Sequence, residues 1–283
     1  MQNSWWIWIS TPDDRMIENI PDYHIHSSVS PDSHESYTNI LNTAQENNIP
    51  ELMLTEHFEF FSGSYKSPKF HEEYLDNYYA KYCLLKQSNP TSVHVGFGIE
   101  FGQPHLQPET AKKFLKKYPF DYVIGSCHKI DNVDLSMYNY KTINIDRLCN
   151  TYFSNLLGIV ENHLCDCLGH LDLFKRYAAR QGIHINIPCE NDYLQKVLKT
   201  AISHGIGIEI NTSGVRYGIG CMPSLEVLKL YSKLHGEIIT LGSDAHRATD
   251  LQRDFDIALD CLKEAGFSYI AQYHNRTPKM IKI

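Results

Sequence analysis

Short apolar runs alternate with longer amphipathic segments along the chain from residue 20 onward. The apolar runs are rich in Ile, Val, Leu and aromatic residues and predict strands, at residues 22–26, 51–57, 93–101, 122–128, 167–173, 205–211 and 238–246. The amphipathic segments predict helices, at residues 35–48, 71–87, 108–117, 146–163, 190–204, 224–235 and 251–265. Several strands are almost continuously apolar, which is typical of parallel strands covered by helices on both faces.

Regular alternation of strand and helix predicts one parallel sheet in a single α/β domain, since no linker rich in Pro, Gly and Ser interrupts it. The 283 residues suit a closed barrel, because a barrel of this kind takes about 250 residues. An open doubly wound sheet is the alternative. Its glycine-rich phosphate-binding motifs are absent, and Gly96-x-Gly98 is followed by Ile99 and Glu100. The sequence therefore favours the barrel.

Residues 1–15 stand apart from this alternation. They contain a five-residue apolar run, Trp5 to Ile9, with no basic residue before it. A secretion signal needs about 7–15 apolar residues behind a positive segment, and a membrane span needs about 20. We therefore predict neither export nor membrane insertion. We expect residues 1–15 to be an extension outside the barrel domain, which covers residues 16–283.

Charge and cysteine content narrow the classes of partner and compartment. The 26 Lys and Arg against 33 Asp and Glu give a net charge of -7, which argues against a binder of nucleic acid polymers. The 8 cysteines have no repeated spacing and favour a reducing cytoplasm. Cys165-x-Cys167 is either a metal-binding pair or part of a buried strand, and its apolar surroundings favour the strand. The 15 histidines are an unusually large supply of metal-binding nitrogens.

Imidazole and carboxylate side chains gather at the C-terminal ends of the predicted strands. In a parallel barrel these ends meet at one rim, where the active site forms. Nitrogen and carboxylate donors on rigid strand ends suit divalent cations. Alone, each residue is more often a hydrogen-bonded rim residue, but together they predict a metal site. The residues are His24, His26, His57, Glu100, His128, His170, Asp244 and His246, and Asp32 is either a further ligand or a helix N-cap.

The ordered motifs H-x-H at residues 24–26, TEH at 55–57, GIE at 98–100, SCH at 126–128, GHLD at 169–172 and SDAH at 243–246 resemble the PHP (polymerase and histidinol phosphatase) metallohydrolases. The resemblance covers about residues 20–275 and is greatest to the histidinol-phosphate phosphatase branch. It implies a distorted, TIM-like (β/α)7 barrel with three divalent metal ions, either Zn, Mn or Fe. It implies three ligand sets: His24, His26, Glu100 and Asp244; Asp32, His57 and His246; and Glu100, His128 and His170, with Glu100 bridging.

The resemblance also implies hydrolysis of L-histidinol phosphate to L-histidinol and phosphate, a step of histidine biosynthesis. A hydroxide bridging the metals would attack, with Glu100, Asp244 and His246 as catalytic residues. Three divalent cations carry a charge of about +6 and three ionised carboxylates a charge of about -3, which leaves about +3. This net charge suits a phosphomonoester dianion together with a hydroxide. For substrate binding we expect Arg176, Arg216 and Arg247, whose planar guanidinium groups grip two oxygens, and His105 beside the Glu100 strand.

Three other functions use a similar set of residues. One is a PHP phosphoesterase acting on a small nucleotide or a phosphodiester. Another is an amidohydrolase-like deacylase, although the lysine bridge common there has no evident counterpart. The last is a metal-sensing module without turnover. The sequence leaves the oligomeric state open.

Overall fold

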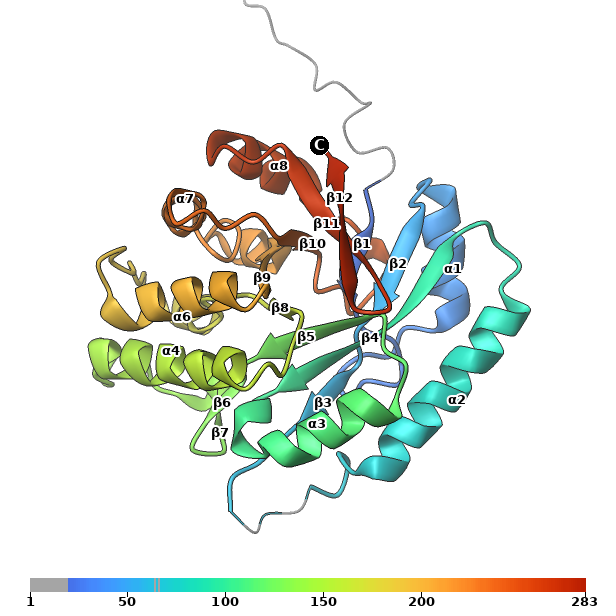
Figure 1. The fold of residues 1–283 in the computed structure, drawn as a ribbon, viewed down its shortest axis with the longest axis horizontal. Helices are drawn as coiled ribbons and strands as arrows, with labels where there is room; N and C mark the ends of the chain where they lie inside the picture. Colours follow the sequence, from blue (N-terminus) through green and yellow to red (C-terminus); the bar gives the residue numbers. More distant parts are fainter. Residues whose placement is uncertain (1–19, 64, 66) are drawn as a thin grey trace, which may run out of the picture.

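The computed structural model describes residues 20–63, 65 and 67–283. It shows a nearly closed barrel of parallel strands with helices around it (Figure 1). The strands follow the order β1-β2-β4-β5-β8-β9-β10, so each neighbours the next along the barrel wall. The predicted α/β barrel is therefore confirmed. The expected extension, residues 1–15, lies outside the described residues and stays a prediction.

Seven parallel strands form the barrel wall, in the segments where the apolar runs predicted strands. They are β1 (Asp22–Ile25), β2 (Glu51–Leu54), β4 (His94–Gly102), β5 (Tyr122–Ser126), β8 (Cys167–Leu168), β9 (Gly207–Asn211) and β10 (Ile239–Gly242). After a break, β3 (His57–Glu59) continues in the direction of β2 and, like β2, pairs with β4. The barrel nearly closes where β1 meets the segment after β10. There Ile25 pairs with Ala245, and His26 N donates to Ala245 O at 2.9 Å.

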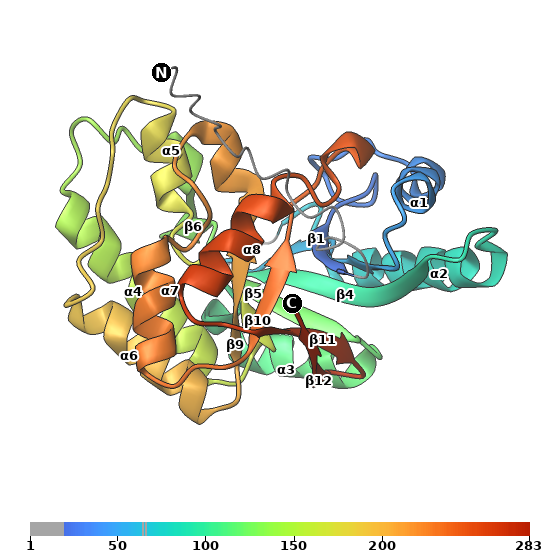
Figure 2. The same ribbon diagram turned by 90° about the horizontal axis from the view of Figure 1, so that it is seen from above.

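Helices cover the outside of the barrel (Figure 2). They are α1 (Tyr37–Glu46), α2 (Glu72–Ser88), α3 (Pro108–Lys117), α4 (Ile145–Glu161), α5 (Phe174–Ala179), α6 (Asp192–Ser203), α7 (Leu225–Lys233) and α8 (Phe255–Glu264). Side chains at N-cap positions stabilise several of their starts, as where Asn191 accepts from Leu194 N. Among the described residues, no helix is long and apolar enough to cross a membrane.

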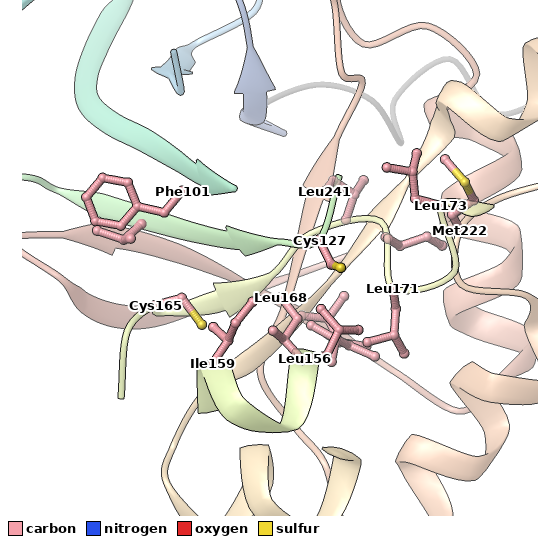
Figure 3. Close-up of a cluster of buried hydrophobic side chains, with 14 of the residues drawn as sticks. Phe101, Cys127, Leu156, Ile159, Cys165, Leu168, Leu171, Leu173, Met222 and Leu241 are labelled. Carbon is pink, nitrogen blue, oxygen red and sulfur yellow. The ribbon is translucent and has the colours of Figure 1, made fainter. Parts of the chain in front are cut away.

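The apolar core has two parts, which together leave the C-terminal rim for polar residues. The larger part lies between the strands and the helices, where Leu156 and Ile159 of α4 lie beside Leu168 of β8 (Figure 3). The smaller part fills the opposite end of the barrel and includes Tyr23, Met53, Tyr122, Ile124, Cys167 and Tyr273. Cys165 and Cys167 are both buried, but β8 contains only Cys167, so the strand interpretation holds for that residue alone.

The structure differs from the sequence-based expectation in several segments. The short α5 and the hairpin of β6 (Lys129–Ile130) and β7 (Val133–Asp134) were not predicted, and two further differences are larger. Residues 167–173 were expected to be one strand, but β8 ends at Leu168 and a turn leads into α5. Leu171 and Leu173 are apolar because they are buried in that turn. The C-terminal hairpin of β11 (Tyr269–His274) and β12 (Thr277–Lys282) was not predicted, because most of β12 is exposed and carries no apolar run.

Candidate metal centre

Glu100 lies at the centre of the rim, and its two carboxylate oxygens face different sets of histidines. Its Oε2 is 3.3 Å from His24 Nε2 and 3.5 Å from His26 Nε2. Its Oε1 is 3.0 Å from His128 Nε2 and 2.9 Å from His170 Nε2. The Glu100 side chain is fully buried. These five residues come from β4 and from the ends of β1, β5 and β8, so the barrel itself brings them together.

The remaining predicted ligands extend the cluster toward solvent. Asp244 Oδ1 is 3.5 Å from His26 Nε2. Asp32 Oδ2 is 3.3 Å from His57 Nε2 and 3.2 Å from His246 Nε2, and Asp32 is half-exposed. The structure therefore brings all nine predicted metal-ligating residues into one cluster at the rim, although they span residues 24 to 246 of the sequence.

The donor atoms fit divalent cations in spacing and in lack of other partners. A tetrahedral ion with ligands at about 2.1 Å separates its donors by about 3.4 Å. The separations above, together with the 2.8 Å between Glu100 Oε2 and His57 Nδ1, run from 2.8 to 3.5 Å. Buried polar atoms normally have hydrogen-bond partners. Five buried atoms of the cluster lack one among the described residues: His24 Nε2, His26 Nε2, His57 Nδ1, His170 Nδ1 and Glu100 Oε2. The His and Glu side chains here form several groups able to hold metal ions.

The electrostatics prepare these groups for a cation. Burial opposes ionisation of Glu100, but His128, His24 and His57 outweigh it and hold the pKa of Glu100 well below its ordinary value. Burial, together with His57, lowers the pKa of His26 well below its ordinary value, which keeps a neutral imidazole. Burial opposes the charged form of His128 as well, but Glu100 and Glu59 raise its pKa to about 9. At His128 a cation and a proton therefore compete for the same nitrogen.

Glu209, on β9, is a residue of the site that sequence reasoning missed. Its Oε1 is 2.7 Å from His24 Nδ1, and its Oε2 accepts the backbone N–H of His170 at 2.7 Å. The side chain is fully buried. Carboxylates behind metal-binding histidines fix the tautomer and the ring orientation. The available signal was an acidic residue inside the apolar run 205–211.

Two further carboxylates support the cluster from behind. Glu59 Oε1 is 2.6 Å from His128 Nδ1, and its Oε2 accepts from Lys129 Nζ at 2.5 Å. Glu56 accepts the Ser30 hydroxyl at 2.6 Å, and that hydroxyl lies 3.2 Å from His26 Nδ1. Glu56 was missed because it breaks the two-residue alternation of the strand-end ligands, and Glu59 because it lies beyond the end of the predicted strand 51–57.

The expected substrate-binding residues separate into three places. Arg176 lines an inner cavity of about 180 Å³ beside the cluster, and its Nη1 donates to Asp244 Oδ2 at 2.7 Å. Arg216 and Arg247 line an outer cavity of about 940 Å³ that adjoins it. His105 lines neither cavity, contrary to expectation. The chain turns away from the rim after β4, so His105 packs against Gly158 of α4, and burial lowers its pKa to about 4.

Comparison with known proteins decides the family. Residues 22–213 match the model of the PHP domain. The chain belongs to the PHP family. The resemblance that the motifs indicated is thus confirmed.

Two of its relatives are named histidinol-phosphatases. A probable histidinol-phosphatase of Clostridium acetobutylicum is 30% identical over 240 residues, 84% of this chain and 91% of that protein. A histidinol-phosphatase of Lactococcus lactis is 27% identical over 258 residues, 89% and 93% of the two chains. The crystal structure of a Lactococcus lactis histidinol phosphate phosphatase, complexed with zinc, L-histidinol and phosphate, superposes on this PHP protein with a TM-score of 0.75. The two sequences are 25% identical, and the aligned part covers 92% of this chain and 99% of the Lactococcus lactis chain.

Proposed function

We propose that the protein is a metal-dependent phosphomonoesterase that hydrolyses L-histidinol phosphate to L-histidinol and phosphate, as a step of histidine biosynthesis. The observation that carries the proposal is the gathering of nitrogen and carboxylate donors around the buried Glu100. Relatives named histidinol-phosphatase span most of the chain, and the solved one binds zinc, L-histidinol and phosphate. These likenesses support the choice of substrate.

We propose the three ligand sets that the family resemblance implies, and the donor spacing is compatible with them. His24, His26, Glu100 and Asp244 would hold one divalent ion. Asp32, His57 and His246 would hold a second, and Glu100, His128 and His170 a third, with one oxygen of Glu100 facing each of the two sets to which it belongs. When bound, such ions supply Lewis acidity and lower the pKa of a coordinated water from 15.7 to about 7.

The residues of the chain orient the phosphate group and set the charge around it. Among the described residues Arg176 is the one arginine of the inner cavity, where Lys129 adds a second positive charge. The Arg176 guanidinium is held by Asp244 and by the Ser213 hydroxyl, to which Nη1 donates at 2.8 Å. This contact fixes the side chain and leaves further N–H groups for phosphate oxygens. Arg176 therefore positions the phosphate, while Glu100, Asp244 and His246 surround the reacting group.

A PHP phosphoesterase that acts on a small nucleotide or a phosphodiester is the second candidate. It is favoured by the outer cavity, whose volume of about 940 Å³ leaves room for leaving groups larger than histidinol. The acidic net charge of -7 still disfavours a polymer.

A substrate panel tests the proposal. Phosphate release from L-histidinol phosphate is compared with release from a nucleoside monophosphate, cleavage of a phosphodiester and hydrolysis of an acyl amide. We expect kcat/KM to be highest for L-histidinol phosphate and to be abolished by a chelator and by Glu100→Gln. Glu161→Gln, an exposed glutamate of α4, is the matched control. Higher kcat/KM for the nucleotide would transfer the proposal to the second candidate.

For the compartment, we propose the cytoplasm. All 8 cysteines are free thiols, which suits a reducing environment.

A further inference from the structure

The arginines at the rim are divided unequally between the two adjoining cavities. The inner cavity touches the histidines of the cluster, and Arg176 is its arginine. The outer cavity adds Arg180, Arg216 and Arg247, which we call the outer arginines. Arg176 and Asp244 line both cavities, so the two are continuous. The outer arginines therefore lie on the route between solvent and the metal centre.

The outer arginines lack the acidic partners that other charged groups of this wall have. Among the residues that the structure describes, no carboxylate lies within 4.0 Å of their guanidinium nitrogens. Five acids line the outer cavity as well, and each has another partner. Asp250 accepts from Arg253 Nη1 at 2.8 Å, and Glu35 accepts the backbone N–H of Ala248 at 2.9 Å. The other three pair with His246, Lys129 and Arg176, and they are Asp32, Asp134 and Asp244. Because charged groups favour an opposite charge nearby, this wall is suited to an anion that comes from solution.

Two of the outer arginines are already held in place. The Arg180 guanidinium stacks on the rings of Tyr177 and Tyr217, at 5.1 and 4.5 Å from their centres. Its Nη2 also donates to the Tyr217 hydroxyl at 2.7 Å. Arg216 Nη2 donates to Ser243 O at 3.0 Å, while Arg216 Nη1 is buried without a hydrogen-bond partner. An anion would therefore meet guanidinium groups whose orientation is partly fixed before it binds.

We propose that Arg180, Arg216 and Arg247 form an outer binding site for a phosphate-class oxyanion, separate from the metal centre. Planar guanidinium groups bind tetrahedral oxyanions through paired N–H donors, and a phosphate dianion has acceptors for all three. This site goes beyond the proposed reaction, since it binds the anion before or after chemistry. Two sources share the chemistry: the phosphate group of an incoming phosphomonoester, and inorganic phosphate that leaves.

Calorimetric titration of the metal-loaded protein with inorganic phosphate tests the site without relying on turnover. We expect two phosphates per chain, one at the metal centre and one at the outer arginines. Arg180→Gln and Arg247→Gln should each weaken the second binding event by about tenfold, the loss expected for one charge-assisted contact, and leave the first unchanged. Arg147→Gln, an exposed arginine at the start of α4, should change neither.

One phosphate per chain in the unaltered protein, or two events that both variants leave unchanged, would overturn the proposal. Steady-state kinetics with the phosphomonoester then distinguish the two sources. A lower kcat/KM in the variants with unchanged inhibition by phosphate identifies capture of the incoming group. Weaker inhibition by phosphate with unchanged kcat/KM identifies release of the product. A protein that binds two phosphates but hydrolyses no phosphomonoester would contradict the proposed function while supporting the outer site.

Discussion

Replacing Glu209 with glutamine tests whether the carboxylate behind the metal cluster holds it in place. In the native chain, Glu209 Oε1 is 2.7 Å from His24 Nδ1 and Oε2 is 2.7 Å from His170 N. Oε2 also accepts from Asn211 Nδ2 at 3.0 Å. Glutamine keeps the volume of the side chain but offers one acceptor oxygen in place of two. The contact to His24 or the contact to His170 must therefore be lost, and the negative charge is lost from both.

The size of the effect follows from those contacts. A hydrogen bond to a charged group contributes about 1.5–3 kcal/mol, and a factor of ten corresponds to about 1.4 kcal/mol. Loss of one contact therefore lowers metal affinity and kcat/KM by about 10- to 100-fold, which is also the range for groups that orient metal-binding histidines. The imidazole of His24 would keep its place on β1 but lose its fixed orientation.

Two measurements on the purified variant check this expectation. The first is metal content by mass spectrometry after dialysis against a weak chelator, and the second is phosphate release from L-histidinol phosphate in excess metal. Glu161→Gln serves as the control, and circular dichroism establishes that both variants are folded. Unchanged metal affinity and unchanged kcat/KM in folded Glu209→Gln would refute the positioning role.

Three further predictions concern protons, space and stability. Because the pKa of His128 is raised to about 9, His128 is protonated at pH 7 in the metal-free protein. Metal affinity, measured by competition with a chelator, should therefore rise between pH 6 and pH 9. An affinity that does not change with pH would contradict this. A Cβ on Gly242 would overlap Glu209 Oε1 and displace this carboxylate from His24. Gly242→Ala should therefore lower the metal content of the purified protein. Full metal content would refute the steric argument. Arg276 donates to Asp166 from Nη2 at 2.8 Å and from Nε at 3.0 Å. Arg276→Ala should therefore lower the free energy of unfolding, measured in urea, by about 2 kcal/mol. An unchanged urea midpoint would contradict this.

The ligands could be predicted because a parallel barrel converts a local pattern into a shared place. His24 and His26 are two apart, as are Asp244 and His246, and each pair ends a predicted strand. Strand alternation and the common direction of the strands then bring them to one rim. Glu209 lies inside an apolar run and Glu59 beyond the end of the predicted strand 51–57, so neither ends a predicted strand. Both act on the far nitrogens of histidines from other strands. Their role depends on three-dimensional packing.

Burial without regular structure explains the errors in the fold. Leu171 and Leu173 are buried, but they lie in the turn after β8, and an apolar run alone does not distinguish such a turn from a strand. The C-terminal hairpin had a different signal. Asn275 and Arg276 both have positive φ and form the two-residue connection between β11 and β12, the geometry that hairpin turns favour. Asparagine before a long cationic side chain is a weak marker of it.

Anomalous diffraction from crystals grown with manganese or zinc tests whether the rim holds three metal ions, since it locates each ion independently of activity. We predict three peaks, with the Glu100 carboxylate between two of them and oxygen-to-ion distances of about 2.1 Å. The third peak should lie among Asp32, His57 and His246. Peaks confined to the molecular surface, or an ordered Glu100 carboxylate with no ion in contact, would contradict this prediction.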